Sequence, residues 1–384
     1  MKFDFDQIID RTSSCSLKWE KYKGKDILPM WVADMDFKCP PAIMEELHKQ
    51  IDHAIFGYSV IPDQLYEITI KNLKRLYGWE VKKEWIVWFP GIVSGINACC
   101  HAFGALGSSS SKIATTTPAY PPFLSAPDNS GNELVTTPLI EKNSRMTFDF
   151  PALEQLFSKN NISLFILCSP YNPCGTVFTR EELSTLADLC FKHSVIICSD
   201  EIHSDFVLDI DKQHIPTASI SEKAAQNTLT FMAPSKTYNI PGLGCSFAVV
   251  KNKNLIKKIK NAAAGIVPDV NTLGLMAAKT AYEKCDEWLS QLIVYLRDNR
   301  DLLEKEINLI PGLKLNHIEA TYLAWIDVRN ANIKNPALFF EDAGVGLSCS
   351  SYFGQKGFVR LNFGCPKSMV EQAIHRISTA ITKK

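Results

Sequence analysis

The chain has 384 residues, which is more than one hydrophobic core usually serves, so we expect two domains within one compact unit. Lysine and arginine together number 41, as do aspartate and glutamate, and a neutral chain has no overall field to gather phosphates. We therefore expect neither nucleic acid nor an anionic membrane as the main partner.

The N-terminal sequence MKFDFDQIIDRTSS alternates charged and apolar residues, with neither the apolar stretch of a secretory signal nor twin arginines. The chain contains no run of 18 apolar residues, so we expect no membrane-spanning helix. Its 12 cysteines are scattered without a C-x-x-C pair, and no H-x-x-x-H or H-E-x-x-H spacing occurs. These features predict a cytoplasmic protein with free thiols and no metal site.

Two helices are the first elements that the sequence predicts. One covers residues 41–55, where proline suits the first turn, and the other covers residues 63–77 and ends at Gly78. The first helix has an apolar face made of Ile43, Leu47, Ile51 and Ile55.

From residue 85 onward, short continuous apolar runs alternate with helical stretches. Such runs are typical of strands buried on both faces, as in a parallel sheet covered by helices. The runs are Trp85–Phe89, Ile113–Thr116, Leu164–Cys168, Val195–Cys198, Thr228–Met232 and Phe247–Val250. Between the third and fourth runs, Thr179 and Glu182 form a capping-box pattern at the start of a helix, and the short serine run Ser108–Ser111 predicts a loop. The middle of the chain therefore predicts an α/β fold with a large mixed or parallel sheet.

The pattern changes again after about residue 285. A long helix is predicted through Trp288–Ile307, followed by strand-like pieces at Ala324–Val328 and Phe358–Phe363 and by a closing helix. This part of the chain predicts a smaller α+β domain.

Ligands of open α/β sheets bind at the carboxyl ends of the strands, so the residues after each apolar run are candidates. The first run is followed by the turn Pro90–Gly95 and a helix, which could bind an anion through backbone N–H groups or be a plain tight turn. Tyr120, held between prolines, could stack on a flat ring or be a core tyrosine. Asn172, in the stiff segment Ser169–Gly175, could present its amide to a ligand or belong to an ordinary Asn-Pro turn.

Three further candidates follow the later strands. Asp200 and Glu201 come directly after a buried strand, where a carboxylate is costly unless a cation, such as a protonated pyridine nitrogen, meets it. His203 could face the same ligand or be a satisfied structural histidine. Lys236 follows the next strand, and a desolvated lysine there would be a nucleophile toward carbonyls, whereas an isolated lysine would more often be a solvated loop residue.

Near the other end of the chain, Arg360 lies in an apolar strand. Its guanidinium suits bidentate capture of an α-carboxylate, and a structural salt bridge is the alternative. Taken together, the lysine, aspartate, asparagine, tyrosine and anion-binding turn are the groups that pyridoxal 5′-phosphate (PLP) requires from a protein.

The sequence resembles the fold-type-I PLP enzymes of the aspartate aminotransferase superfamily, and within it the MalY/PatB group of cystathionine β-lyases, also called C–S lyases. The segments that carry the resemblance run in the same order across nearly the whole chain. They are Leu28–Phe37, Phe56–Ser59, Pro118–Tyr120, Ser169–Gly175, Ser199–His203, Ala233–Asn239, Thr321–Trp325 and Phe358–Pro366.

The resemblance implies a large PLP-binding domain at residues 47–285, with a mixed, mostly parallel sheet of the seven-stranded type between helices. A small α+β domain would combine residues 1–46 with residues 286–384. It also implies a homodimer with shared active sites, in which Tyr58 reaches the phosphate region of the neighbouring subunit.

The resemblance also implies a role for each site residue. Lys236 would be the Schiff-base lysine and proton shuttle, and Asp200 would keep the pyridine nitrogen protonated. The other cofactor-binding residues would be Ile92, Val93, Tyr58, Tyr120, Asn172, His203 and Ser235. The substrate-binding residues would be Ala33, Tyr58, Asn172, Tyr322 and Arg360.

Two positions depart from the pattern of the superfamily. Many members have a tyrosine three residues after the aspartate, where this chain has His203, as in the lyase group. Many also have a phosphate-binding arginine eight residues after the lysine, where this chain has Gly244. The phosphate must therefore be held by other groups.

The activity implied by the resemblance is a PLP-dependent β-lyase that cleaves L-cystathionine or related cysteine S-conjugates to a thiol, pyruvate and ammonia, in sulfur amino acid metabolism and methionine biosynthesis. The same motifs would serve an aminotransferase of the superfamily. A third reading is a PLP-binding regulatory protein that works by binding another protein.

Overall fold

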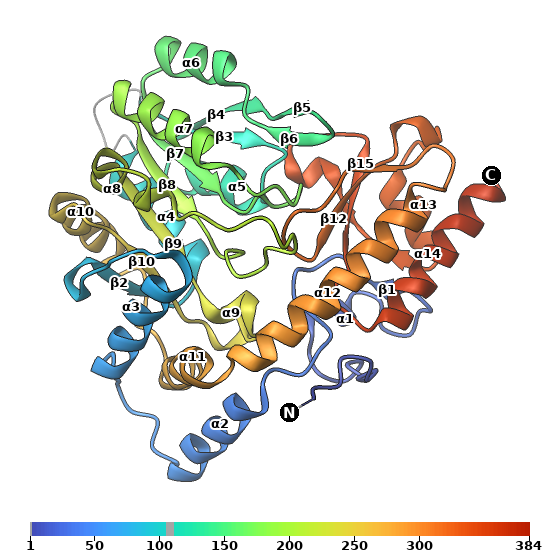
Figure 1. Cartoon of the computed structure of the whole chain (residues 1–384), viewed down its shortest axis with the longest axis horizontal. Helices are drawn as coiled ribbons and strands as arrows, with labels where there is room; N and C mark the ends of the chain where they lie inside the picture. The colour runs from blue at the N-terminus through green and yellow to red at the C-terminus, as the bar shows by residue number, and fades with distance from the viewer. Residues whose placement is uncertain (1, 105–110) are drawn as a thin grey trace.

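The computed structural model describes residues 2–104 and 111–384, so the predicted loop at Ser108–Ser111 falls almost wholly outside the described residues. A seven-stranded sheet forms the centre of the larger part of the molecule (Figure 1). Its strands, in chain order, are β2 (Ile86–Phe89), β3 (Lys112–Thr117), β4 (Glu133–Pro138), β7 (Ile162–Cys168), β8 (Ile196–Asp200), β9 (Thr228–Met232) and β10 (Ser246–Val249).

The strand order is β2-β10-β9-β8-β7-β3-β4. Strand β10 is antiparallel to both of its neighbours, and the pairs from β9 to β4 are parallel. The predicted α/β class with a mixed, mostly parallel sheet is confirmed. Each of the six predicted apolar runs lies on a strand, and the edge strand β4 is an addition that the apolar pattern did not indicate.

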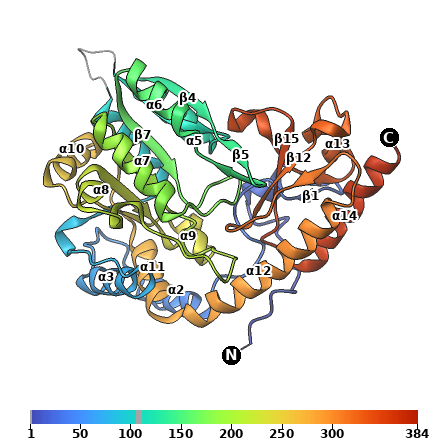
Figure 2. The same cartoon turned by 45° about the horizontal axis from the view of Figure 1, so that its top comes forward.

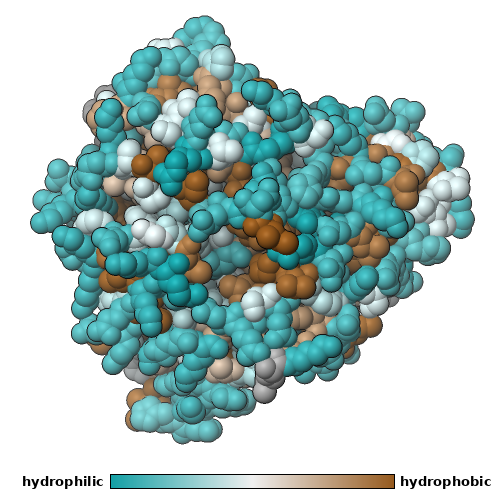
Figure 3. Space-filling view, in the orientation of Figure 1, coloured by the Kyte–Doolittle hydropathy of each residue, from teal (hydrophilic) through white to brown (hydrophobic). Residues whose placement is uncertain are grey.

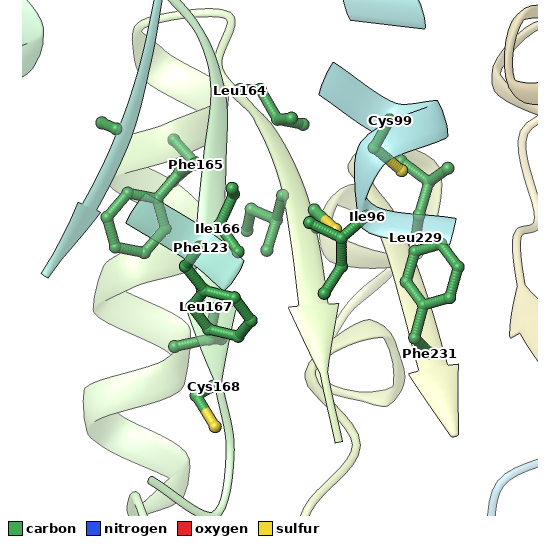
Figure 4. Packing of buried hydrophobic residues seen from close by; sticks show 14 of the residues in the cluster. Ile96, Cys99, Phe123, Leu164, Phe165, Ile166, Leu167, Cys168, Leu229 and Phe231 are labelled. Carbon is green, nitrogen blue, oxygen red and sulfur yellow. The ribbon is translucent and has the colours of Figure 1, made fainter. Parts of the chain in front are cut away.

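Helices flank this sheet, which explains why its strands are apolar on both faces (Figure 2). They are α4 (Ile92–Phe103), α5 (Pro121–Asn129), α6 (Phe150–Lys159), α7 (Arg180–Lys192), α8 (Glu222–Asn227) and α10 (Lys253–Ala263). Helix α4 contacts α5 and α10, while α7 contacts α6 and α8. Between α4 and the strands, Ile96 and Cys99 pack with Leu229 and Phe231 (Figure 4).

The capping box predicted at the start of α7 is present. The backbone N–H of Glu182 donates to Thr179 Oγ1 at 3.2 Å, and the backbone N–H of Thr179 donates to Glu182 Oε2 at 2.8 Å. Two otherwise unpaired N–H groups at the helix start are satisfied in this way.

The two early helices are α2 (Pro41–His53) and α3 (Asp63–Tyr77), and both pack against α11 (Thr272–Lys284). Helix α3 ends at Gly78 as predicted, with φ +63°. Helix α2 ends before the predicted residue 55, because Ala54 adopts a left-handed conformation. Its apolar face is buried only at the N-terminal end, since Ile51 and Ile55 are 50% and 69% exposed.

Helix α12 (Asp286–Ile307) leads into the C-terminal region, where β11 (Lys314–Leu315), β12 (Leu323–Asp327), β15 (Phe358–Asn362) and β14 (Ser348–Cys349) form an antiparallel sheet in that order. Helices α13 (Pro336–Asp342) and α14 (Lys367–Thr382) complete this region, and a short hairpin, β5 (Ile140–Lys142) with β6 (Arg145–Thr147), extends from the larger part.

The N-terminal segment packs with the C-terminal region. Strand β1 (Leu28–Pro29) pairs in parallel with β13 (Val345–Gly346), and the Phe5 ring meets the Trp288 ring edge-on, with centroids 5.6 Å apart. Helix α1 (Leu17–Glu20) lies in this segment. This packing is the one that the resemblance implies, while domain boundaries near residues 46 and 285 stay a prediction. Across the described residues, no helix has both the length and the apolar character needed to cross a bilayer.

Candidate active site

A cavity of about 720 Å³ lies beyond the carboxyl ends of β7, β8 and β9. All predicted site residues except Tyr58 and Tyr322 line it, and they are Ala33, Ile92, Val93, Tyr120, Asn172, Asp200, His203, Ser235, Lys236 and Arg360. They come from the central sheet, from the N-terminal segment and from the C-terminal region. Hydrophobic side chains gather near the middle of the face drawn in Figure 3, whereas its periphery is largely hydrophilic.

Lys236 lies in the short helix α9 (Pro234–Thr237), directly after β9. Its Nζ donates a hydrogen bond of 2.7 Å to the carbonyl oxygen of Ala33. Removal from water lowers the pKa of Lys236 to about 8, the charge of Asp34 opposes this shift, and the charge of Arg360 adds to it. The neutral, nucleophilic form of this amine is therefore far more populated near neutral pH than it is for an ordinary lysine.

Asp200 is the last residue of β8 and is buried. Its Oδ1 accepts a hydrogen bond of 3.1 Å from the backbone N–H of Ile202. Burial raises the pKa of Asp200 to about 7, although this hydrogen bond and the charge of Lys236 both act to lower it. A cation placed against this carboxyl group would stabilise its ionised form.

Glu201, the neighbouring carboxylate, has a different set of partners. It is fully buried, and its Oε2 lies 2.7 Å from Nε2 of His214. Its Oε1 accepts hydrogen bonds from Ser199 Oγ at 2.8 Å and from the backbone N–H of Thr217 at 2.9 Å. Of the two adjacent carboxylates, only Asp200 lines the cavity.

His203 is buried in the cavity wall, and its Nδ1 has no hydrogen-bond partner among the described residues. Burial, together with the positive charges of Lys236 and Arg360, lowers the pKa of His203 to about 3. The imidazole is therefore neutral, with one nitrogen available to a ligand.

Arg360 lies on β15 and reaches the cavity from the C-terminal region. Its Nη1 donates to Asn172 Oδ1 at 3.1 Å, and its Nη2 donates to the Trp31 carbonyl at 2.8 Å. The guanidinium lies over the Phe353 ring, 4.8 Å from its centroid, while the buried Nε has no partner among the described residues. Burial lowers the pKa of Arg360 to about 10, so the group stays charged at neutral pH and can donate to an anion.

The predicted anion-binding turn lies at the start of α4. Gly91 precedes the helix without a side-chain cap, and Gly91, Ile92 and Val93 line the same cavity as Ser235. Uncapped N–H groups and the positive end of a helix favour an anion here.

Gly244 takes the position where many superfamily members have an arginine, and the backbone explains its identity. Its φ is +56°, and a Cβ atom would lie 2.8 Å from the carbonyl oxygen of Pro90, beside the anion-binding turn. An arginine is therefore incompatible with this local conformation.

The two remaining predicted residues lie outside the cavity lining. Tyr322 is buried behind it, and its hydroxyl donates to the Ala33 carbonyl at 2.9 Å, the same oxygen that Lys236 contacts. Tyr58 is fully exposed in the segment after α2.

Several lining residues were not predicted from the sequence. They include Leu17, Lys21, Trp31, Val32, Tyr352 and Phe353. Trp31 and Val32 belong to the segment Leu28–Phe37, which carries part of the family resemblance. The carbonyls of Val32 and Asp34 both accept hydrogen bonds from Asn362 Nδ2. This segment could have indicated Trp31 and Val32 as site residues, whereas Lys21 and Tyr352 lie in no motif. Within the described part of the chain, no three His, Cys, Asp or Glu side chains are grouped to hold a metal ion.

Comparison with known proteins shows which family this chain belongs to. Cystathionine beta-lyase PatB of Bacillus subtilis (strain 168) is 34% identical over 393 residues, which cover 99% of this chain and 100% of that protein. The crystal structure of OvoB matches with a TM-score of 0.96 and 42% identity over 100% of both chains. Cystalysin from Treponema denticola, whose crystal structure contains a PLP cofactor, matches with a TM-score of 0.94 and 31% identity over 100% of both chains. The model of the family "Aminotransferase class I and II" matches residues 25–377. This chain belongs to the aminotransferase class I and II family.

Proposed function

We propose that this protein is a PLP-dependent carbon–sulfur β-lyase that cleaves L-cystathionine or related cysteine S-conjugates to a thiol, pyruvate and ammonia. The observation that carries the proposal is the convergence of Lys236, Asp200 and Arg360 in one cavity. The full-length similarity to a curated cystathionine β-lyase supports β-elimination over transamination as the reaction.

The residues of the cavity fit PLP. A buried carboxyl group suits a cationic ring nitrogen, an uncapped helix start suits a phosphate, and the unpartnered His203 Nδ1 is available beside them. The residues that would hold the cofactor are Lys236 through its amine, Asp200 at the ring nitrogen, Asn172 at the ring hydroxyl oxygen, Tyr120 against the ring, and Ile92, Val93 and Ser235 around the phosphate. When bound, the cofactor supplies a cationic ring that withdraws electrons from Cα of an amino acid.

The side chains of the chain itself perform the remaining tasks. Arg360 holds the substrate carboxylate with its guanidinium, which Phe353, Asn172 and the Trp31 carbonyl orient. The amine of Lys236, with its pKa near 8, takes the Cα proton and can return a proton to a departing group. Asp200 is ionised once a cation faces it, and it balances the positive charge of that cation.

A homodimer is part of the proposal. The segment that follows α2 carries apolar side chains that this chain leaves exposed, namely Ile55, Phe56, Tyr58 and Val60. An exposed apolar group of this kind favours burial against another subunit, and Tyr58 would then enter the site of its partner. We also propose a cytoplasmic role in sulfur amino acid metabolism and methionine biosynthesis.

An aminotransferase is the second candidate, because the chain matches the aminotransferase family model and the same side chains serve both reactions. A regulatory protein that uses PLP only for structure is disfavoured, since it would have no need of a desolvated lysine beside Asp200 and Arg360.

The test is to incubate the PLP-loaded protein with L-cystathionine, without a keto acid, and to follow pyruvate, free thiol and the visible cofactor spectrum. The Lys236→Ala variant is run beside it. Pyruvate and thiol from the wild type alone are expected, with loss of the lysine-linked cofactor band in the variant. A normal cofactor band with turnover only after a keto acid is added would favour the aminotransferase, and failure to bind PLP would overturn the proposed role of Lys236.

A further inference from the structure

Three cationic side chains line the active-site cavity in the described structure, and the reaction uses only Lys236 and Arg360. The third is Lys21, which directly follows α1 and is 43% exposed. Its lining neighbours Leu17 and Tyr352 are 72% and 67% exposed, so this part of the lining is the mouth of the cavity.

The ammonium group of Lys21 is held in place by its neighbours, but they do not use all of its hydrogen-bond donors. Its Nζ lies 5.1 Å from the centroid of the Trp31 ring, donates to Tyr22 Oη at 2.7 Å and contacts Glu341 Oε2 at 3.2 Å. Burial acts to lower the pKa of Lys21, but Tyr22 and Glu341 outweigh it and raise the pKa above its usual value. An ammonium group has three N–H donors, so one remains for a ligand.

Trp31 connects this cation to the one that holds the substrate carboxylate. Its backbone carbonyl accepts a hydrogen bond of 2.8 Å from Arg360 Nη2, and its indole ring faces Lys21. Trp31, Val32 and Leu347 line the same cavity as the two cations and contribute apolar surface to its wall. Such a site suits a molecule with an anionic group at each end of an aliphatic chain.

We infer that Lys21 binds an anionic group at the far end of the departing thiol, so that the preferred substrates are cysteine S-conjugates whose thiol fragment carries a carboxylate. This inference rests on the proposed β-lyase function and deepens it by naming a residue that selects among the proposed substrates, of which L-cystathionine carries such a carboxylate. Glu341 competes with the substrate carboxylate for the same ammonium group.

The test uses two substrates that differ in one group. S-(2-carboxyethyl)-L-cysteine carries the distal carboxylate, and S-propyl-L-cysteine has a similar chain that ends in a methyl group. The ratio of their kcat/KM values is measured on the PLP-loaded wild type and on the variants Lys21→Met, Lys21→Arg, Glu341→Gln and Lys23→Met. Lys23 is an exposed neighbour paired with Glu20 and is the matched control.

Lys21→Met is expected to lower kcat/KM for the carboxylate substrate about fivefold, as for a partly exposed ion pair, and to leave the propyl substrate unchanged. Lys21→Arg and Lys23→Met should keep the wild-type ratio. Glu341→Gln should raise kcat/KM for the carboxylate substrate alone, because it removes the competing anion. If the Lys21–Glu341 pair were merely structural, Lys21→Met and Glu341→Gln would each lose activity on both substrates. That result would overturn the inference.

The outcome is separable from that of the proposed function. An unchanged ratio in Lys21→Met, with pyruvate formed from both substrates, overturns the role of Lys21 and leaves the lyase intact. If neither substrate yields pyruvate, the lyase proposal fails. In that case the dissociation constants of the two amino acids are measured from changes in the cofactor spectrum. The wild type should bind the carboxylate compound more tightly than the propyl compound, and Lys21→Met should lose this preference. Equal constants for the two compounds in the wild type would refute the role of Lys21.

Discussion

Nζ of Lys236 donates a 2.7 Å hydrogen bond to the carbonyl of Ala33, which lies 203 positions earlier in the chain. The same carbonyl accepts the hydroxyl of Tyr322 at 2.9 Å. The N-terminal segment is thus attached both to the reactive lysine and to the C-terminal region. Its packing and the placement of the lysine amine therefore depend on each other.

The lowered pKa of Lys236 predicts how PLP uptake depends on pH. Only the neutral amine attacks the aldehyde, and burial brings the pKa from the usual lysine range down to about 8. The rate of cofactor uptake by the apoprotein should rise with pH and level off above about 8. Stopped-flow absorbance of the lysine-linked band measures this rate, with Nα-acetyl-lysine as the reference that should still be rising there. A midpoint at the ordinary lysine value would contradict the desolvation of this amine.

Replacing Asp200 tests the proposed partner of the ring nitrogen. Asp200→Asn keeps the size of the side chain but removes the charge that would hold a cationic ring, so kcat should fall about 100-fold with a smaller change in KM. Steady-state pyruvate formation measures the effect. The exposed Asp188→Asn on α7 serves as the control and should behave as wild type. Near-normal kcat in Asp200→Asn would assign the ring nitrogen another partner.

The pair of Glu201 and His214 lies buried next to the active site and should contribute to stability. The side chains are 0% and 2% exposed, and His214→Ala leaves Glu201 Oε2 without its partner. A loss of about 3 kcal/mol in the free energy of unfolding is expected, because a buried polar group loses its hydrogen-bond partner. Urea unfolding measures this loss. Glu222→Ala, which removes an exposed ion pair with Lys251, should change the midpoint little. Equal midpoints for the two variants would show that the buried pair is not stabilising.

Gly244 provides a test of the local backbone beside the anion-binding turn. Gly244→Ala places a Cβ 2.8 Å from the Pro90 carbonyl at a φ of +56°, so unfolding should become about 1–2 kcal/mol easier and PLP affinity should fall. Gly242→Ala is the control, since its Cβ would meet nothing within 4 Å. Urea unfolding and cofactor titration measure the two effects. If the two variants behave alike, the strained conformation is not what excludes a side chain at position 244.

Local features were predictable wherever a short stretch of chain decides the outcome. The apolar runs are strands of a sheet that helices cover on both faces. Thr179 begins a helix because its side chain accepts a hydrogen bond from an N–H group of the first turn. Gly78 ends a helix because glycine tolerates positive φ. The residues that follow β7, β8 and β9 could be named as one site, since parallel strands bring their carboxyl ends to one edge.

Other features required contacts between distant parts of the chain. Strand β4 lies at an edge, with Leu134 and Val135 only half-buried, so its pattern resembled no buried strand. Ile51 and Ile55 form an apolar face that this chain leaves open, which helical periodicity alone could not reveal.

The sequence by itself determined the fold class, the family resemblance and the reactive set around Lys236, because motifs and periodicity are properties of neighbouring residues. The family resemblance already assigned the ring nitrogen to Asp200, and the tertiary structure supplies the physical reason, since His214 contacts Glu201 and leaves Asp200 lining the cavity. Only the tertiary structure brought Lys21 to the mouth of that cavity. No spacing along the chain encodes such a placement, because it depends on how the N-terminal segment packs against residues more than 300 positions away.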